Sequence, residues 1–221
     1  MRIGIFSDTY LPQINGIVTS ITTFAEAFEK LGHEVFIFAP KMSGSEKGSR
    51  KNILFNSFYF PFQADFRFSI PFSLRLFNFK RFKLDIIHVQ TPFSLGYLGR
   101  YLARKHNIPL VYTYHMYFTE YSHYVPIIPR GLIKPYAIKE SRHFCNQCQL
   151  VVVPSHQMRD KLVEYGITSP MEIVPSGISP RDLIAAFNTE IFRKRHGISH
   201  EDRLAKANLF YPAFQQSKNP L

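Results

Sequence analysis

Residues 3–39 read "IGIFSDTYLPQINGIVTSITTFAEAFEKLGHEVFIFA" and predict a strand, a loop, a helix and a second strand, in that order. Ile3–Phe6 and His33–Ala39 are short apolar runs of the kind that form buried strands. Between them, apolar residues recur every three to four positions, which predicts an amphipathic helix over Ile17–Leu31. Gly32 follows at the place where helices commonly end in the left-handed conformation. The loop Ser7–Gly16 is rich in turn formers and small polar groups.

The same alternation of apolar runs and helical patterns continues along the chain. Further strands are expected at Leu84–Gln90, Ile108–Tyr114, Gln149–Ser155 and within 171–178, with helices within 91–107, 130–147 and 156–165. Strands that alternate with helices imply parallel pairing through right-handed crossovers, and parallel strands are apolar on both faces. The sequence therefore predicts an open, doubly wound, mostly parallel Rossmann-like α/β sheet over residues 1–180.

A ligand crevice is expected where the parallel strands end, because such sheets bind ligands at the point where the strand order reverses. The segments expected to surround it are 7–16, 90–95, 114–121, 154–155 and 175–177. The sequence has neither a Gly-rich dinucleotide motif after the first strand nor a P-loop. The remaining candidate for a phosphate site is Gly16, at the start of a helix whose free N–H groups and dipole favour an anion. Asn15–Gly16 is equally consistent with a simple tight turn.

The net charge of +11 and the pI of about 9.7 favour an anionic partner, such as a nucleotide, a nucleic acid or an acidic lipid surface. No RRM, KH or helix-turn-helix pattern supports nucleic acid. No signal peptide is evident, and no window has the ~18 continuous apolar residues of a membrane span. We therefore expect a cytoplasmic protein that is soluble or peripheral to a membrane.

The two cysteines, Cys145 and Cys148, form a CxxC pair between a helix and a strand. Redox use requires the pair at a helix N-terminus, and zinc requires about four ligands, although His143 and His156 are near in sequence. We interpret the pair as structural thiols.

Residues 55–83 combine ten of the 22 phenylalanines with a cluster of cations. From Pro71 onward, apolar and basic residues interleave in a pattern that we interpret as a basic amphipathic helix, suited to an anionic lipid interface. The alternative is that the phenylalanines pack under the sheet and the cations form a solvated face. The predicted membrane-binding residues are Arg67, Arg75, Phe77, Lys80, Arg81 and Lys83.

Six segments together resemble the N-terminal half of a retaining glycosyltransferase of family 4, which has the two-domain GT-B fold. They are "MRIGIFSDTYLPQINGIVTSI" (1–21), "LGHEVFIFAP" (31–40), "DIIHVQTPFSLG" (85–96), "PLVYTYHMYFTEYSHY" (109–124), "LVVVPSHQMRDKL" (150–162) and "IVPSGI" (173–178). Bacterial diacylglycerol glucosyltransferases are the most similar members, followed by phosphatidylinositol mannosyltransferases.

The resemblance implies that the loop at Asn15–Gly16 lies over the diphosphate of the donor, and that His115 faces the donor sugar and the acceptor. His115 is expected at the end of a strand, where imidazole can hydrogen-bond a sugar hydroxyl or share a proton. The alternative is a core histidine bonded to the backbone. Glu120 is a weaker candidate, either an acceptor-side base or a solvated carboxylate. The full set of predicted binding residues is Asn15, Gly16, Thr91, Tyr114, Tyr117, Ser155 and Gly177.

The activity implied by the resemblance is transfer of a hexose from a nucleotide-sugar to a hydroxyl, with retention of configuration. Neither a metal nor a cofactor is expected, since the leaving phosphate helps to deprotonate the acceptor on the same face. The expected partners are a nucleotide-sugar, a lipid or sugar hydroxyl acceptor and an anionic membrane, with no nucleic acid. The expected location is the inner face of the cell membrane.

The C-terminal residues depart from this family pattern. Residues 181–221 are expected to hold a linker helix and a truncated or rearranged start of the second domain, which we predict to be missing. By this interpretation the chain alone is inactive or nearly so. The alternatives are a non-catalytic lipid-binding module and the acceptor half of a two-chain transferase.

Overall fold

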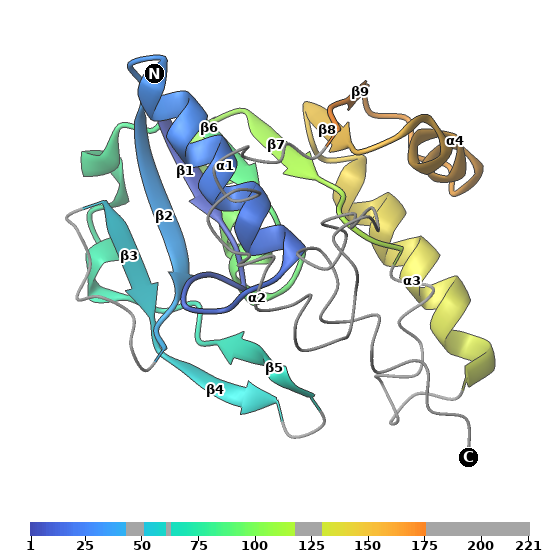
Figure 1. Ribbon diagram of the computed structural model, residues 1–221, viewed down its shortest axis with the longest axis horizontal. Coiled ribbons are helices and arrows are strands. Elements are labelled where there is room, and N and C mark those ends of the chain that lie inside the picture. Colours follow the sequence, from blue (N-terminus) through green and yellow to red (C-terminus); the bar gives the residue numbers. More distant parts are fainter. Residues whose placement is uncertain (43–50, 61–62, 118–129, 176–221) are drawn as a thin grey trace, which may run out of the picture. The chain divides into compact units, whose positions relative to one another are not determined.

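A central parallel sheet organises the protein in the computed structural model, which describes residues 1–42, 51–60, 63–117 and 130–175 (Figure 1). Its strands are β1 (Arg2–Phe6), β2 (Glu34–Pro40), β3 (Asn52–Phe55), β6 (Ile86–Val89), β7 (Leu110–Thr113), β8 (Leu150–Val153) and β9 (Met171–Ile173). All are parallel, in the order β3-β2-β1-β6-β7-β8-β9. The helices are α1 (Gly16–Lys30), α2 (Ser94–His106), α3 (Arg130–Cys145) and α4 (His156–Glu164). The predicted doubly wound parallel sheet is confirmed.

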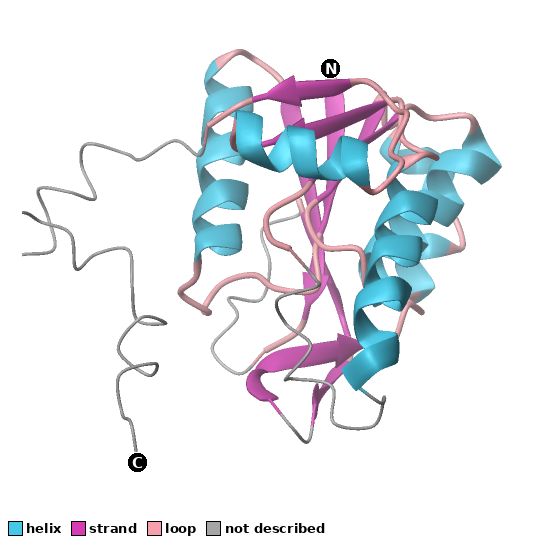
Figure 2. Cartoon of the chain, turned by 90° about the vertical axis from the view of Figure 1, so that its right-hand side faces the viewer, coloured by secondary structure: helices cyan, strands magenta, loops and turns pink. Residues whose placement is uncertain are grey.

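Alternate residues of β1 face two separate apolar cores. Ile3 and Ile5 belong to the core under α1, and Phe6 belongs to the larger core that α2, α3 and α4 help to form. Figure 2 shows helices on both sides of the sheet. This arrangement follows from the pleat, which sends successive side chains to opposite faces, and it explains why the buried strands have no polar face.

Helix α1 begins and ends where its sequence indicates. Asn15 is its N-cap, and the Asn15 side chain accepts a hydrogen bond from the Val18 N–H at 2.9 Å. Gly32 adopts φ +80°, the left-handed conformation that glycine reaches without strain. The predicted helix is therefore confirmed to within one residue at each end.

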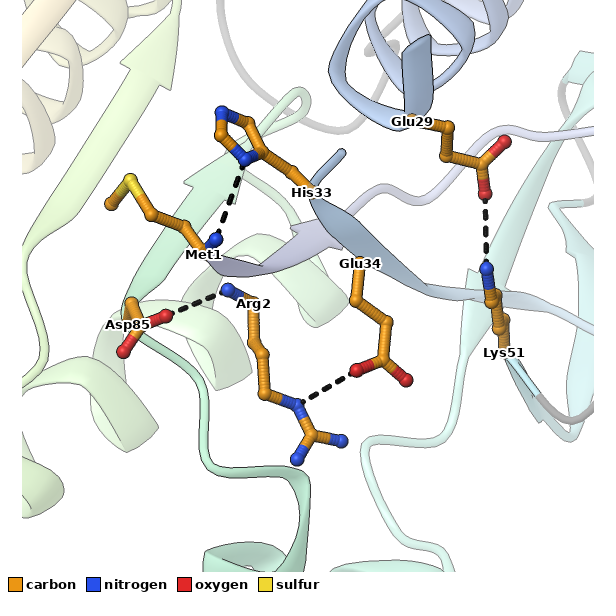
Figure 3. Close-up of polar contacts among 7 residues, drawn as sticks. All are labelled: Met1, Arg2, Glu29, His33, Glu34, Lys51 and Asp85. Carbon is orange, nitrogen blue, oxygen red and sulfur yellow. Dashed lines mark hydrogen bonds and ion pairs between the residues drawn. The ribbon is translucent and has the colours of Figure 1, made fainter. Parts of the chain in front are cut away.

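Polar contacts join the start of β1 to its neighbours at the amino edge of the sheet, the edge where the parallel strands begin (Figure 3). The Arg2 backbone N–H donates to Asp85 at 2.7 Å, and the Arg2 guanidinium lies 3.1 Å from the Glu34 carboxylate. Such exposed ion pairs typically add less than about 1 kcal/mol each. The hydrogen bond to Asp85 and the ion pair with Glu34 connect β1 to the residue before β6 and to β2, and neither contact belongs to the candidate functional site.

The aromatic segment differs from its prediction. Strands β4 (Ser57–Phe60) and β5 (Gln63–Ser69) pair antiparallel in a hairpin that was not predicted from the sequence. The expected amphipathic helix after Pro71 is wrong, because the chain instead makes two short 3-10 turns, Leu74–Leu76 and Phe79–Phe82. Phe79 and Phe82 are buried against Phe38, so the alternative of packing under the sheet holds for these two rings.

Other phenylalanines of the same segment remain on the surface. Phe72 and Phe77 are 61% and 78% exposed, and their rings contact each other at a centroid distance of 5.9 Å. Lys80, Arg81 and Lys83 are exposed beside them. The side chains of Arg67 and Arg75 lie outside the described residues. We call the exposed apolar side chains of the hairpin and turns, namely Phe58, Phe68, Ile70, Phe72, Leu74 and Phe77, the aromatic surface.

Cys145 and Cys148 are free, buried thiols at the end of α3. Burial raises the pKa of Cys148 to about 12 and raises that of Cys145 as well, so neither is a reactive thiolate at neutral pH. Among the described residues, no three His, Cys, Asp or Glu side chains gather as a metal site would require. Both thiols thus have the buried environment that structural cysteines favour.

Within the same described ranges, none of the helices has both the length and the apolar character needed to cross a bilayer. The predicted domain boundary at residue 180 and the expected linker over 181–221 lie outside the described residues.

Candidate functional site

The strand order reverses between β1 and β6, at the centre of the sheet. From β1 the chain moves outward through β2 to β3, and from β6 it moves the other way through β7, β8 and β9. At such a switch point the loops after the two central strands diverge and leave a crevice at the carboxyl edge, the edge where the strands end. The loops concerned are 7–15, after β1, and 90–93, after β6.

Asp8 joins these two loops to helix α2. The Asp8 carboxylate is buried, accepts a hydrogen bond from the Thr91 hydroxyl at 2.9 Å and accepts another from the Leu95 backbone N–H at 2.9 Å. The Ser94 hydroxyl also donates to it. Burial raises the pKa of Asp8, while these hydrogen bonds oppose the rise. Asp8 thus supplies the negative charge that the N-terminus of α2 favours.

Among the described residues, no such carboxylate bonds to the N-terminus of α1. No acidic residue lies in its first turn, and a Cβ added at Gly16 would meet nothing within 4 Å. Gly16 is exposed, and among the described glycines only Gly32 and Gly166 have positive φ. Neither backbone conformation nor internal packing therefore requires glycine at position 16. Asn15–Gly16 forms the N-cap and the first residue of α1 rather than a separate tight turn, and the diphosphate role of this helix end stays a prediction.

His115 lies just beyond the end of β7 and is half-buried. His115 Nε2 is 2.7 Å from Gln90 Oε1, so within the described part of the chain the ring bonds to a side chain of the neighbouring loop. Burial lowers the pKa of His115 to about 4. The ring is therefore neutral at pH 7, which makes it a hydrogen-bonding group rather than a cation for the diphosphate.

The topology brings Gly16 and His115 to the same edge of the sheet. β1 pairs with β6 and β6 with β7, all parallel, so the loops after these strands leave in the same direction. A cavity of about 520 Å³ lies at the amino edge instead, between the end of α2 and the residues preceding β7 and β8. None of the predicted site residues lines this cavity.

The remaining predicted site residues occupy different environments. Thr91 is buried and bonded to Asp8, and Tyr114 is completely buried, with its hydroxyl 3.0 Å from Ser141 Oγ. Ser155 caps α4, and its hydroxyl accepts from the Met158 N–H at 3.2 Å. Tyr117 is half-buried against the larger core. Glu120 and Gly177 lie outside the described residues.

Sequence reasoning did not single out Asp8, His88 or Gln90, although Asp8 and Gln90 lie in segments expected to surround the crevice. His88 stands among apolar residues of β6, where it is buried beside the Phe24 ring. A signal was present, because polar residues two apart in an extended segment share a face, as His88 of β6 and Gln90 just after it do. Burial, with a smaller effect from nearby His115, lowers the pKa of His88 to about 3.

The two buried histidines should make the fold sensitive to acid. The unfolded chain takes up protons near pH 6.5, whereas the folded state holds His115 and His88 neutral down to about 4 and 3. Their stabilisation is complete above pH 6.5 and is lost as the pH falls towards those values, by about 1.4 kcal/mol per pH unit for each histidine. Urea unfolding followed by circular dichroism at pH 7.5, 6.0 and 5.0 measures this slope.

His88→Asn should reduce the slope. Comparing the variant with the wild type isolates His88 from Asp8, whose raised pKa acts in the opposite direction. Equal slopes in the two proteins would contradict the assignment of His88 as a buried neutral group.

Comparison with known proteins gives three related findings. A model of Glycosyltransferase Family 4 matches residues 14–182. The chain is 38% identical over 211 residues to an alpha-monoglucosyldiacylglycerol synthase of Streptococcus pneumoniae, covering 92% of this chain and 47% of that protein. It is 24% identical over 203 residues to a GDP-mannose-dependent alpha-mannosyltransferase of Mycobacterium tuberculosis, covering 88% and 52%. The chain therefore spans about half the length of the curated relatives it matches.

Among solved structures, sucrose-phosphate synthase from Thermosynechococcus elongatus is similar with a TM-score of 0.59 and 14% identity. The match covers 90% of this chain and 53% of that one. At this identity the likeness concerns the fold alone, and it confirms the expected Rossmann-like half of a GT-B architecture.

Proposed function

Because the chain belongs to glycosyltransferase family 4, we propose that it forms the acceptor-side half of an enzyme that transfers a hexose from a nucleotide-sugar to a lipid hydroxyl. The observation that carries this proposal is the open N-terminus of α1 at the switch point of the sheet. Similarity to a glucosyldiacylglycerol synthase favours a diacylglycerol-type acceptor. The proposed activity belongs to the whole enzyme, of which this chain covers about half.

The charges at the carboxyl edge favour one place for the diphosphate. Asp8 already occupies the N-terminus of α2, where it would repel a second anion. Asn15 caps the Val18 N–H, so the N-terminus of α1 offers the backbone N–H groups of Gly16 and Ile17, and Gly16 leaves room for phosphate oxygens to reach them. We assign the donor diphosphate to this helix end, with Asn15 holding the first turn through its cap.

In the proposed reaction, the bond between the anomeric carbon and the diphosphate oxygen breaks as the acceptor oxygen bonds to the same face of that carbon. The acceptor's hydroxyl proton passes to the leaving diphosphate. The protein contributes orientation and stabilisation of the charge on the leaving group. His115, neutral at pH 7, hydrogen-bonds a hydroxyl of the sugar or the acceptor. Its low pKa favours this role over proton transfer.

A titration of the ¹⁵N-labelled chain with UDP and with GDP, followed by NMR, tests the diphosphate site. We expect the largest shifts at the amides of Gly16, Ile17 and Val18. Shifts confined to the cavity at the amino edge, or no shifts at millimolar nucleotide, would overturn the assignment. Transfer of labelled glucose or mannose to diacylglycerol, with and without a candidate second chain, tests the reaction itself.

The aromatic surface supports peripheral membrane binding on the same proposal. Exposed phenylalanines insert into the interface, and nearby cations each add about 1 kcal/mol on an anionic surface. The residues proposed for this contact are Phe77, Lys80, Arg81 and Lys83, with Phe72 added because of its exposure. A lipid-binding module without transferase activity is the second candidate function, and it predicts vesicle binding without nucleotide shifts.

Phe72→Ser combined with Phe77→Ser should weaken binding to vesicles containing anionic lipid at least tenfold, since each ring loses about 2 kcal/mol of apolar burial. Sedimentation with vesicles measures the change. Leu31→Ser is the matched control, because Leu31 is also a highly exposed apolar residue (72%) but lies at the C-terminal end of α1, outside the aromatic surface. Equal loss in the control, or none in the double variant, contradicts the proposed surface.

A further inference from the structure

A chain of hydrogen bonds runs from the interior of the sheet to His115. Thr113 Oγ1 lies 2.7 Å from His88 Nε2, Gln90 Nε2 lies 3.0 Å from the same His88 nitrogen, and Gln90 Oε1 lies 2.7 Å from His115 Nε2. The arrangement follows from the pleat. His88 lies on β6 and Gln90 follows it by two residues, just past the end of the strand. Thr113 ends β7, the parallel neighbour of β6, and His115 follows it by two residues.

The chemistry of the amide decides where the ring protons lie. An amide nitrogen can only donate, so His88 Nε2 must be the acceptor and His88 carries its proton on Nδ1. An amide oxygen can only accept, so His115 Nε2 must carry the proton. A neutral His115 then has its free lone pair on Nδ1.

We propose that Gln90 is a positioning residue that fixes His115 in the Nε2–H tautomer and so makes its Nδ1 a hydrogen-bond acceptor. The inference rests on the proposed function only for the identity of the group that His115 meets. An acceptor nitrogen binds a donor such as a sugar or glycerol hydroxyl, and it disfavours a carbonyl or carboxylate, which can only accept. Gln90 would thereby select a hydroxyl at this point of the crevice.

The Gln90 amide contacts two histidines, the buried His88 on one side and His115 on the other. Gln90 and His88 are both buried. Burial also holds both histidines neutral at pH 7, as their low pKa values indicate. Rotation of the amide by half a turn would require the proton of His88 on Nε2 and that of His115 on Nδ1, so the two orientations of Gln90 demand opposite tautomers of both rings. The tautomer of the buried ring is therefore coupled through Gln90 to that of the ring that reaches the edge.

Long-range ¹H–¹⁵N correlation spectra of the labelled chain at pH 7.5 test the proposal without any ligand. His115→Asn identifies the His115 signals by their disappearance. We expect a protonated Nε2 and an unprotonated Nδ1 in the wild type. In Gln90→Met, which keeps the side-chain length and removes both hydrogen bonds, the ratio of the two tautomers should fall at least about fivefold, the equivalent of about 1 kcal/mol.

Gln149→Met is the matched control, because the Gln149 amide also hydrogen-bonds next to a strand, but at the amino edge, where it accepts from Leu110 N–H at 2.7 Å. It should leave the His115 signals unchanged. A proton on Nδ1 of His115 in the wild type, or an unchanged tautomer ratio in Gln90→Met, would overturn the proposal.

Gln90→Glu provides a further discrimination. A carboxylate offers acceptors in both directions, so His115 should keep its proton on Nε2 while His88 moves its proton from Nδ1 to Nε2. If His88 keeps its proton on Nδ1 in this variant, Gln90 does not couple the tautomers of the two histidines. These spectra need no nucleotide, so a failed nucleotide titration with the expected tautomers would reject the proposed function alone, and the reverse result would reject only the role of Gln90.

Discussion

Replacing Gly16 with valine should weaken binding of a nucleoside diphosphate at least tenfold while changing the free energy of unfolding by less than about 1 kcal/mol. The space beside Gly16 is empty of protein atoms, so a larger side chain displaces nothing within the fold. In the proposed complex the same space holds phosphate oxygens bonded to the first N–H groups of α1. Losing one charge-assisted hydrogen bond costs about 1.5–3 kcal/mol, which corresponds to at least a tenfold change in affinity.

Titration of UDP and GDP by NMR, together with urea unfolding, measures both quantities for Gly16→Val. Ala27→Val is the matched control, because it places the same side chain on an exposed position of α1 away from its N-terminus. The control should bind as the wild type does. Unchanged affinity in Gly16→Val would remove the diphosphate from this helix end, whatever the stability result.

Gly96→Ala should lower the free energy of unfolding by about 3 kcal/mol. A Cβ at position 96 would lie 1.9 Å from the Thr91 carbonyl oxygen and 3.1 Å from Val89 Cγ1. The Thr91 oxygen belongs to the backbone, so the clash can be relieved only if α2 moves away from β6. Overpacking of this kind typically costs about 1–3 kcal/mol. The movement would also strain the contact between the Asp8 carboxylate and the backbone N–H groups of Leu95 and Gly96.

Urea unfolding monitored by circular dichroism measures this loss. Gly16→Ala adds the same methyl group to another helix start, where it meets no neighbour, and should change the stability by less than about 1 kcal/mol. Equal stability of the two variants would mean that α2 does not approach β6 as closely as the structure places it.

The fold was largely predictable because its signals are local. The strand patterns, the helical spacing over Ile17–Leu31 and the glycine at position 32 each depend on residues adjacent in sequence, and the structure has all three. The prediction of a helix after Pro71 was wrong because it, too, used only local signals. The apolar residues of this segment resemble a helix locally, but the chain makes only two short 3-10 turns, the second of which packs Phe79 and Phe82 against Phe38.

The candidate site was predictable only in outline. The order of the predicted strands and helices is enough to place the crevice at the carboxyl edge of the sheet and to place Gly16 and His115 at that edge. The partners of these residues do not, because Asp8 and Leu95 are 87 positions apart, and Gln90 and His115 are 25 positions apart. Such contacts depend on which strands become neighbours and in what register. Polar residues two apart at the ends of β6 and β7 were the available signal for the Gln90 contact.

The central place of β1 has a consequence for how the protein is made. Ile3 pairs with Val35 on one side and with Ile86 on the other. On the ribosome the first strand must therefore wait for more than eighty residues of further synthesis before its second neighbour emerges. Pairing over such sequence distances is slow and exposes strand edges to other chains. The nascent polypeptide should consequently depend on chaperones most strongly before β6 has cleared the exit tunnel.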